Sequence, residues 1–279
     1  MMIGLRKSRL WEIALLGGAL LFALFYLAPF LTIVLTSFKP AAEVIASPPR
    51  LLPSHFSIEN YLHMASALNI GRSMWNSLVV TFGSTAIAMA LGSMAGYAVA
   101  RSHSPVVRSF FLLALLARVV PPVTLAIPIL GMIRWAGLID TQIGLILVHA
   151  ALNLPFVIWM SSGFFQDIPA DLEEAAIVDG CNRFTAFTRI ILPVATPGLA
   201  ATAIFAAMLS WNEYLFALLL TNVEAKTAPV AVSELLNVYS SEWGAMTAAG
   251  TLFTIPVLIL AIIIQRRIVE GMAMGAVKG

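Results

Sequence analysis

The sequence predicts an all-α, polytopic membrane protein with six transmembrane helices and one polar loop between the fourth and the fifth. Of its 279 residues, 60% are hydrophobic and only 11% are charged, whereas about 25% of the residues in soluble domains are charged. Several apolar runs reach roughly 20 residues, the length at which a helix crosses about 30 Å of hydrocarbon. The chain therefore has too little charge for a soluble globule and enough apolar length for several spans.

The six spans follow from the apolar runs and the polar breaks between them. The first run is too long for the core of a signal peptide, so we expect it to remain in the protein. Pro121 and Pro122 fall inside the third run and predict a kink rather than an end, because neighbouring helices can satisfy the freed carbonyl groups. The expected spans are Trp11–Ser37, Asn76–Ala100, Ser109–Ile133, Thr141–Phe164, Pro197–Thr221 and Met246–Arg266.

The basic residues predict the direction of insertion. Membrane proteins concentrate Lys and Arg on the cytoplasmic side, and this topology has one side much richer in them. Both termini and the polar loop are therefore expected in the cytoplasm. The richer side holds Arg6, Lys7, Arg9, Arg101, Arg108, Arg183, Arg189, Arg266, Arg267 and Lys278, and the other side holds Lys39, Arg50, Arg72, Arg134 and Lys226.

The remaining segments predict one transmembrane domain over residues 1–279, with a core at 76–268 and a tail at 267–279. The outer segments 38–73 and 222–245 are too short to form separate domains. A net charge of +2 without a basic run argues against a nucleic-acid partner. The single cysteine, Cys181, excludes an internal disulfide and a cysteine-based metal cluster, and the four histidines lack metal-ligand spacing, so no metal site is expected.

The polar loop, at about 165–196, begins with the signals of a short helix. Pro169 suits a first helical turn, where its missing N–H is not needed. Asp171, Glu173 and Glu174 follow at positions where the helix dipole favours negative charge.

A second short helix is expected after Gly180, which permits a tight reversal. Phe184, Phe187 and Ile191 would give it one apolar face, and Pro193 would close it. Two short helices with apolar faces and acidic edges suit insertion into a groove of a cytoplasmic partner. The periodicity fits equally well an ordinary loop whose helix lies among the lipid headgroups.

The spacing across this loop resembles the EAA signature of permease subunits in ATP-binding-cassette (ABC) importers. It consists of Glu174-Ala175-Ala176, three residues, Gly180, nine residues and Ile190-x-Leu192-Pro193. Cys181 stands where that family usually has alanine. Further segments resemble the carbohydrate-importing branch, and most of all the second, shorter permease of maltose-type systems: Asp179-Gly180, Trp211-Asn212-Glu213-Tyr214 and Gly275-Ala276-Val277-Lys278-Gly279.

The resemblance implies a type I ABC importer permease in a bacterial or archaeal cytoplasmic membrane. The polar loop would be a coupling loop that sits in a cleft of an ATPase subunit, and the tail would run along the ATPase pair. The residues implied in coupling are Glu173, Glu174, Ala175, Ala176, Asp179, Gly180, Phe187 and Pro193, and those implied in the tail contact are Gly275, Val277 and Lys278.

The same resemblance implies the partners of the chain. They are a homologous second permease, two cytoplasmic ATPase subunits that hold ATP and Mg²⁺, and an external sugar-binding protein that the segment 222–245 would touch. In maltose-type systems the partner permease supplies most sugar contacts. The chain itself has no Gly-x-x-x-x-Gly-Lys-Ser/Thr phosphate loop, so it is expected to bind no cofactor and to be no enzyme.

Polar residues inside the expected spans are the candidates for a translocation path. Arg118 and Glu213 are the most deeply placed charges, and a charge there is costly enough to indicate function. A structural ion pair or a water-lined cavity is the alternative. Asn153 and Asn212 can hydrogen-bond sugar hydroxyls and Trp211 can stack on a sugar ring, but the same residue types also hold helices together.

Other residues in the spans favour packing. Gly92 and Gly96 would allow close helix approach, and His149 is expected to be a hydrogen-bonded core residue. The leading hypothesis is thus a permease that moves a di- or oligosaccharide inward. An importer permease of the same superfamily for polyamines or glycerol phosphate esters is one alternative. A secondary transporter is another, although no inverted repeat is visible.

Overall fold

The computed structural model describes residues 9–67, 69–235 and 242–276, and its regular elements there are all helical. Within these ranges, five helices are long and apolar enough to cross a membrane, and a strongly bent helix pair raises the number to six if it counts as one span. This agrees with the predicted architecture. Contacts divide the chain into two compact units, which we describe separately: unit 1 is Met1–Leu68 with Glu234–Leu252, and unit 2 is Asn69–Ser233 with Phe253–Gly279.

Unit 1 joins the end of the first span to the outer segment 38–73. Its helices are α1 (Arg9–Ser37), α2 (Ala41–Val44), α3 (Glu59–Ala67) and the start of α13 (Trp243–Ala276). The amide Nδ2 of Asn60, on α3, donates to the carbonyl oxygens of Ser37 and Lys39 at 3.1 and 2.7 Å. A Cβ atom at Gly244 would lie 2.1 Å from Asn60 Oδ1. One buried amide thus ties the end of α1 and the first turn of α13 to α3.

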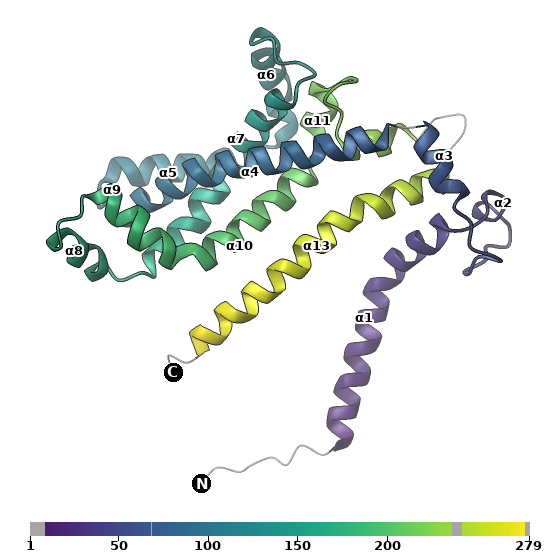
Figure 1. Ribbon diagram of the computed structural model, residues 1–279, viewed down its shortest axis with the longest axis horizontal. Coiled ribbons are helices and arrows are strands. Elements are labelled where there is room, and N and C mark those ends of the chain that lie inside the picture. Colours follow the sequence, from purple (N-terminus) through teal and green to yellow (C-terminus); the bar gives the residue numbers. More distant parts are fainter. Residues whose placement is uncertain (1–8, 68, 236–241, 277–279) are drawn as a thin grey trace. The chain divides into compact units, whose positions relative to one another are not determined.

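Unit 2 is built on three helices that run alongside one another (Figure 1): α4 (Ile70–Arg101), α7 (Gln142–Gln166) and α10 (Leu192–Trp211). Gly92 and Gly96 allow the close approach of α4 to α7. A Cβ atom at Gly92 would lie 2.6 Å from Val157 Cγ1, and one at Gly96 would lie 2.2 Å from Ser161 Oγ. The predicted packing role of both glycines is confirmed.

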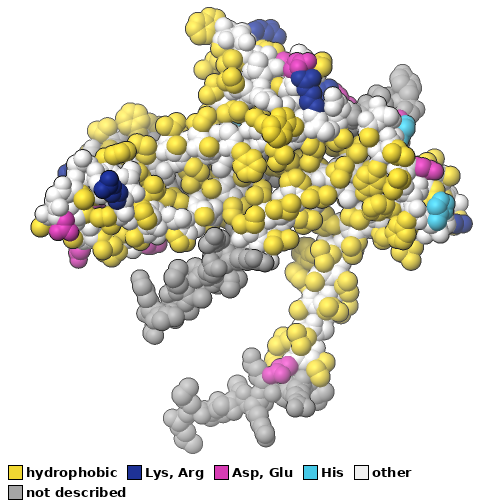
Figure 2. All heavy atoms as spheres, viewed as in Figure 1, with side chains coloured by type: hydrophobic (Ala, Val, Ile, Leu, Met, Phe, Trp, Pro, Cys, Tyr) yellow, Lys and Arg dark blue, Asp and Glu magenta, His cyan; other side chains and the backbone are white. Residues whose placement is uncertain are grey.

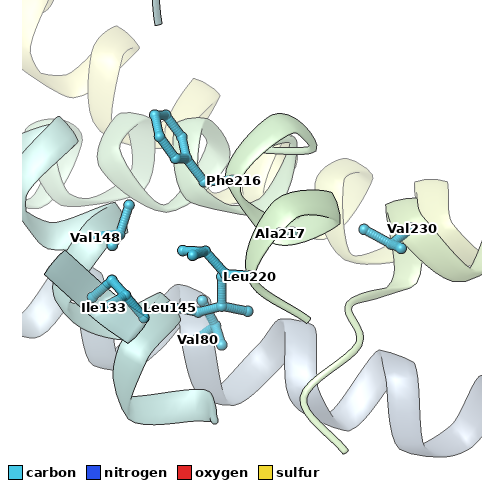
Figure 3. Close-up of a cluster of buried hydrophobic side chains, with 8 residues drawn as sticks. All are labelled: Val80, Ile133, Leu145, Val148, Phe216, Ala217, Leu220 and Val230. Atoms are coloured by element: carbon cyan, nitrogen blue, oxygen red, sulfur yellow. The ribbon is translucent and has the colours of Figure 1, made fainter. Parts of the chain in front are cut away.

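Two apolar clusters fix the ends of this helix group. One joins α6 (Pro122–Trp135), α11 (Leu215–Leu220) and α12 (Ala228–Glu234) to α4 and α7 (Figure 3). Its buried members are Val80, Ile133, Leu145, Val148, Phe216, Ala217, Leu220 and Val230. The other joins the end of α7 to a π-helical turn, η1 (Phe187–Ile191), and to α10; its buried members are Phe165, Ile168, Phe187, Ile191, Ala195 and Leu199.

The third predicted span is not one kinked helix. It consists of α5 (Pro105–Ala117) and α6 (Pro122–Trp135), which are bent by 102° at residues 118–121. Pro121 precedes another proline, which disfavours helical backbone, and it adopts an extended conformation with φ −56° and ψ 129°. Single prolines such as Pro128 and Pro155 remain inside helices, so the prediction of a kink is wrong only at the proline pair.

The fifth predicted span also has different limits. The membrane-length helix begins at Arg183 and ends at Trp211, and a separate short helix, α11 (Leu215–Leu220), follows. The Glu213 carboxylate accepts hydrogen bonds from the backbone N–H groups of Phe216 and Ala217 at 3.0 and 3.1 Å. Glu213 therefore starts a new helix inside the run that hydropathy joined into one.

The segment that follows α11 is held by one carboxylate. Asp140, in the corner between α6 and α7, accepts hydrogen bonds from the backbone N–H groups of residues 222–225 at 3.0–3.1 Å. Partial burial tends to raise the pKa of Asp140, but these four donors outweigh it and lower the pKa to about 2. The ionised carboxylate thus anchors the beginning of the outer segment 222–245.

This anchor predicts a pH-dependent loop. Because the folded-state pKa of Asp140 lies below that of an unfolded aspartate, its stabilisation is complete above about pH 4 and is lost as the pH falls toward about 2. After allowance for solvent screening we expect a contribution on the order of 1 kcal/mol. Hydrogen exchange should show protected amides at 222–225 near pH 6, weaker protection near pH 2.5 and little at either pH in Asp140→Asn. Equal protection in both proteins would contradict the anchor.

Candidate functional site

The polar loop begins with α8 (Asp171–Val178), whose first turn holds Asp171, Glu173 and Glu174 as predicted. Gly180 ends it with a positive φ of +89°. The N–H of Cys181 donates to the carbonyl of Ala176 at 2.9 Å, and the N–H of Gly180 donates to that of Ile177 at 3.0 Å. These two bonds form a Schellman motif, whose left-handed residue is usually glycine. The predicted reversal at Gly180 is confirmed.

The second part of the loop is not a separate helix closed by proline. The helix α9 (Arg183–Ala186) begins at the Asn182 cap and continues through a π-helical turn, η1 (Phe187–Ile191), into α10. The N–H of Leu192 donates to the carbonyl of Phe187, five residues back. A proline ring clashes with the carbonyl four residues earlier in a regular α-helix, and the wider turn before Pro193 changes that local geometry.

The expected apolar face of the second helix is divided. Phe187 and Ile191 are buried against Phe165 and Tyr97, with the rings of Phe187 and Tyr97 4.7 Å apart. Phe184 is instead 66% exposed. The expected apolar face is therefore found at Phe187 and Ile191 and is wrong at Phe184, which lies in the first turn of α9, before the π turn.

The inner face of α8 is fastened to the end of α4. The Glu173 carboxylate accepts a hydrogen bond from the Tyr97 hydroxyl and another from Arg101 Nε at 3.1 Å. Arg101 also donates to the carbonyl of Ile168, just before α8, at 3.0 Å. Ala176 is buried on the same side. The loop is thus a braced projection of unit 2.

The outer face of the loop, which we define by its exposed side chains, is apolar with acidic edges. Its members are Leu172, Glu174, Ala175, Ile177, Val178, Asp179 and Phe184. Figure 2 shows hydrophobic side chains over the middle of unit 2 and charged side chains gathered where α8 and α9 lie. Glu173 and Glu174, which are adjacent in the sequence, therefore have different surroundings: the first faces unit 2 and the second faces outward.

The brace predicts a measurable loosening of α8 when Arg101 is replaced. Arg101→Met removes charge-assisted bonds to Glu173 and Ile168, and such bonds contribute about 1.5–3 kcal/mol each. We expect amide exchange across 171–178 to accelerate about tenfold or more in the assembled complex. Arg108→Met, which removes an exposed arginine from the same end, is the matched control. Similar exchange rates in the two variants would disprove the brace.

A cavity of about 390 Å³ lies beside both helix breaks of unit 2. Three predicted path residues, Arg118, Asn153 and Glu213, line it. The cavity is bordered by residues 117–129 of α5, α6 and their connection, by residues 149–155 of α7 and by residues 209–216 around the break after α10. Most of its remaining lining is apolar.

A buried polar chain, missed by sequence reasoning, supports Glu213. His149 Nε2 lies 3.1 Å from Glu213 Oε2, and His149 Nδ1 lies 2.8 Å from Ser210 Oγ. Ser210 Oγ is in turn 2.8 Å from Ser84 Oγ. The prediction that His149 is a hydrogen-bonded core residue is confirmed. No spacing along the chain signals this set, because its members come from α4, α7, α10 and the break after α10.

Two other predicted path residues do not line the cavity. Trp211 is buried and stacks on Phe253, with ring centroids 5.3 Å apart. Asn212 is exposed and donates to the Met208 carbonyl one turn back. Of the predicted tail contacts, Gly275 lies in the last turn of α13, whereas Val277 and Lys278 lie outside the described residues. The last helix extends to Ala276, beyond the predicted end of the span at Arg266.

Comparison with known proteins places this architecture in a family. Residues 88–274 match the model of the "binding-protein-dependent transport system inner membrane component" family. The chain is 37% identical over 283 residues to the trehalose transport system permease protein SugB of Mycobacterium tuberculosis, covering 99% of this chain and 100% of that one. It is 32% identical over 281 residues to the trehalose/maltose transport system permease protein MalG of Thermococcus litoralis, covering 99% and 100%.

The fold also matches a solved structure. A chain of a bacterial ABC transporter involved in the import of the acidic polysaccharide alginate superposes with a TM-score of 0.78 at 24% identity, covering 95% of this chain and 99% of that one. With the helical spans and the braced loop, these matches show that the chain belongs to the binding-protein-dependent transport system inner membrane component family and is a multi-pass permease subunit of an ABC importer.

Proposed function

We propose that the chain carries a di- or oligosaccharide into the cell as one of two permeases of an ATP-driven importer. The names of the full-length relatives, which transport trehalose or trehalose and maltose, support this cargo. The whole chain then acts as one permease domain beside a homologous second permease. ATP and Mg²⁺ are bound by two ATPase subunits, and a sugar-binding protein delivers the cargo from outside.

The observation that carries the proposal is the two-faced loop. Its inner face is braced by Glu173, while its outer face leaves Glu174 and a set of apolar side chains exposed. Exposed apolar patches of this kind are typical of protein interaction sites. The outer face sits in a cleft of an ATPase subunit. When ATP binding closes the ATPase pair, the brace transmits the movement from α8 to α4. The sugar path then opens alternately to the two sides of the membrane.

The distribution of basic residues supports the orientation. Arg101, Arg183 and Arg189 lie at the end of unit 2 that carries α8 and α9, which we place in the cytoplasm together with both termini. The segment anchored by Asp140 then faces outward, where it meets the sugar-binding protein. The tail residues Gly275, Val277 and Lys278 extend toward the ATPase pair.

The test is reconstitution of the complete complex, co-expressed from neighbouring genes, in proteoliposomes loaded with ATP. We expect uptake of labelled trehalose or maltose that requires ATP, the ATPase subunits and the binding protein. Uptake that persists without the ATPase subunits would identify a secondary transporter. Uptake of polyamines or glycerol phosphate esters in place of both sugars would overturn the proposed cargo.

A further inference from the structure

The cavity beside the two helix breaks holds polar groups whose hydrogen-bonding capacity is only partly used within the described residues. Arg118 lies over the Phe156 ring, 5.1 Å from its centroid, and no carboxylate pairs with it among the described residues. Asn153 is 4% exposed and uses its Nδ2 to donate to the Ala206 carbonyl at 3.2 Å. These groups leave bonding capacity at a cavity wall.

The position of the cavity points to water or cargo rather than to lipid. Irregular backbone at 118–121 and 212–214 borders it, and irregular backbone at membrane depth is tolerated only inside protein or along a water-filled cavity. Asn153 is eleven residues beyond Gln142, the first residue of α7. At about 1.5 Å per residue it lies roughly 16 Å along that helix, near the middle of a hydrocarbon core about 30 Å thick.

The lining suits a sugar ring. Hydroxyl groups both donate and accept hydrogen bonds, whereas the C–H faces of the ring are apolar. The cavity offers donors at Arg118 and Asn153, an acceptor at Glu213, and apolar walls at Leu125 and Leu152. Its volume of about 390 Å³ falls within the roughly 300–1,000 Å³ typical of small-molecule sites.

We propose that this cavity is a subsite for a neutral sugar unit, contributed by this chain itself. Arg118 and Asn153 donate to ring hydroxyls and Glu213 accepts from one. His149 and Ser210 are positioning residues that hold the Glu213 carboxylate at the break after α10. The inference rests on the proposed sugar-import function, and it differs from the expectation that the partner permease supplies most sugar contacts.

The first experiment measures trehalose moved per ATP hydrolysed by the reconstituted complex. Arg118→Gln and Asn153→Leu should lower uptake at least tenfold, while the ATPase activity stimulated by the binding protein stays within about twofold of the native value. Arg134→Gln, an exposed arginine outside the cavity, should change neither. Size-exclusion profiles identify any variant that fails to assemble. If the buried Asn153→Leu variant fails to assemble, the result for Arg118→Gln decides the test.

The second experiment tests occupancy directly. Arg118→Cys and, as its control, Arg134→Cys are made in a Cys181→Ala background and labelled with a water-soluble thiol reagent. Trehalose should slow labelling at position 118 and leave labelling at position 134 unchanged. Protection by glucuronate but not by trehalose would overturn a neutral-sugar site in favour of an anion site. If trehalose does not slow labelling at position 118, and if Arg118→Gln moves as much trehalose per ATP as the native complex, the subsite is disproved.

These outcomes separate the inference from the function on which it depends. If the native complex imports trehalose and the cavity variants behave like it, only the subsite is disproved. If the native complex imports neither trehalose nor maltose, the proposed function is disproved and the cavity experiments lose their substrate.

Discussion

Gly180→Pro is expected to abolish ATP-driven uptake while leaving the membrane spans folded. Gly180 has a φ of +89°, and its N–H donates to Ile177 within the Schellman motif. Proline fixes φ near −65° and has no N–H, so neither the reversal nor this bond can form. The turn must open, and the outer face of α8 moves relative to the brace at Glu173.

A graded series at Gly180 tests this explanation. Asn tolerates left-handed backbone better than other residues, so Gly180→Asn should keep most of the uptake. Gly180→Ala should lose about 1–2 kcal/mol of local stability, and Gly180→Pro should lose all coupling. The readouts are uptake per ATP and the thermal stability of the purified complex. Gly163→Ala is the control, because the space around that helical glycine is open. Equal uptake in the Asn and Pro variants would show that the conformation of residue 180 has no role in coupling.

Composition and spacing predicted the spans and the loop because these depend on local properties. Apolar length identifies a membrane helix whatever its neighbours are, and Gly180 marks a reversal through its own backbone freedom. The breaks at 118–121 and 212–214 were not predicted, since hydropathy averages over them. A proline is compatible with both a kink and an end, and only the pair at Pro121 and Pro122 produced an end.

The working parts of the site depend on contacts that spacing does not encode. The brace joins Tyr97 and Arg101 to Glu173, more than 70 residues away in the sequence. Likewise, Glu213 was predicted as a membrane charge, but its neighbour His149 comes from another helix. The sequence therefore identified polar residues worth testing, whereas their partners became visible only when α4, α7 and α10 were assembled.

Gly96→Val is expected to prevent stable assembly of unit 2. A Cβ atom at Gly96 would lie 2.2 Å from Ser161 Oγ and 3.0 Å from two backbone atoms of α7, the Ile158 carbonyl oxygen and the Ser162 nitrogen. A side chain can rotate away, but backbone atoms move only if α4 and α7 separate. Overpacking typically costs about 1–3 kcal/mol, and occasionally more, and we expect the upper end of that range here.

Thermal unfolding of the purified complex measures the effect, with Gly71→Val on the same helix as the control, because no atom lies near a Cβ there.

A double variant separates the two sources of strain. Gly96→Ala combined with Ser161→Ala removes the hydroxyl contact but keeps the backbone contacts, so it should recover only part of the stability lost in Gly96→Ala. Full recovery would mean that the hydroxyl alone limits the approach of the helices. If the double variant recovers none of the stability, the whole loss comes from the backbone contacts, because removing the Ser161 hydroxyl then has no effect on the cost of overpacking.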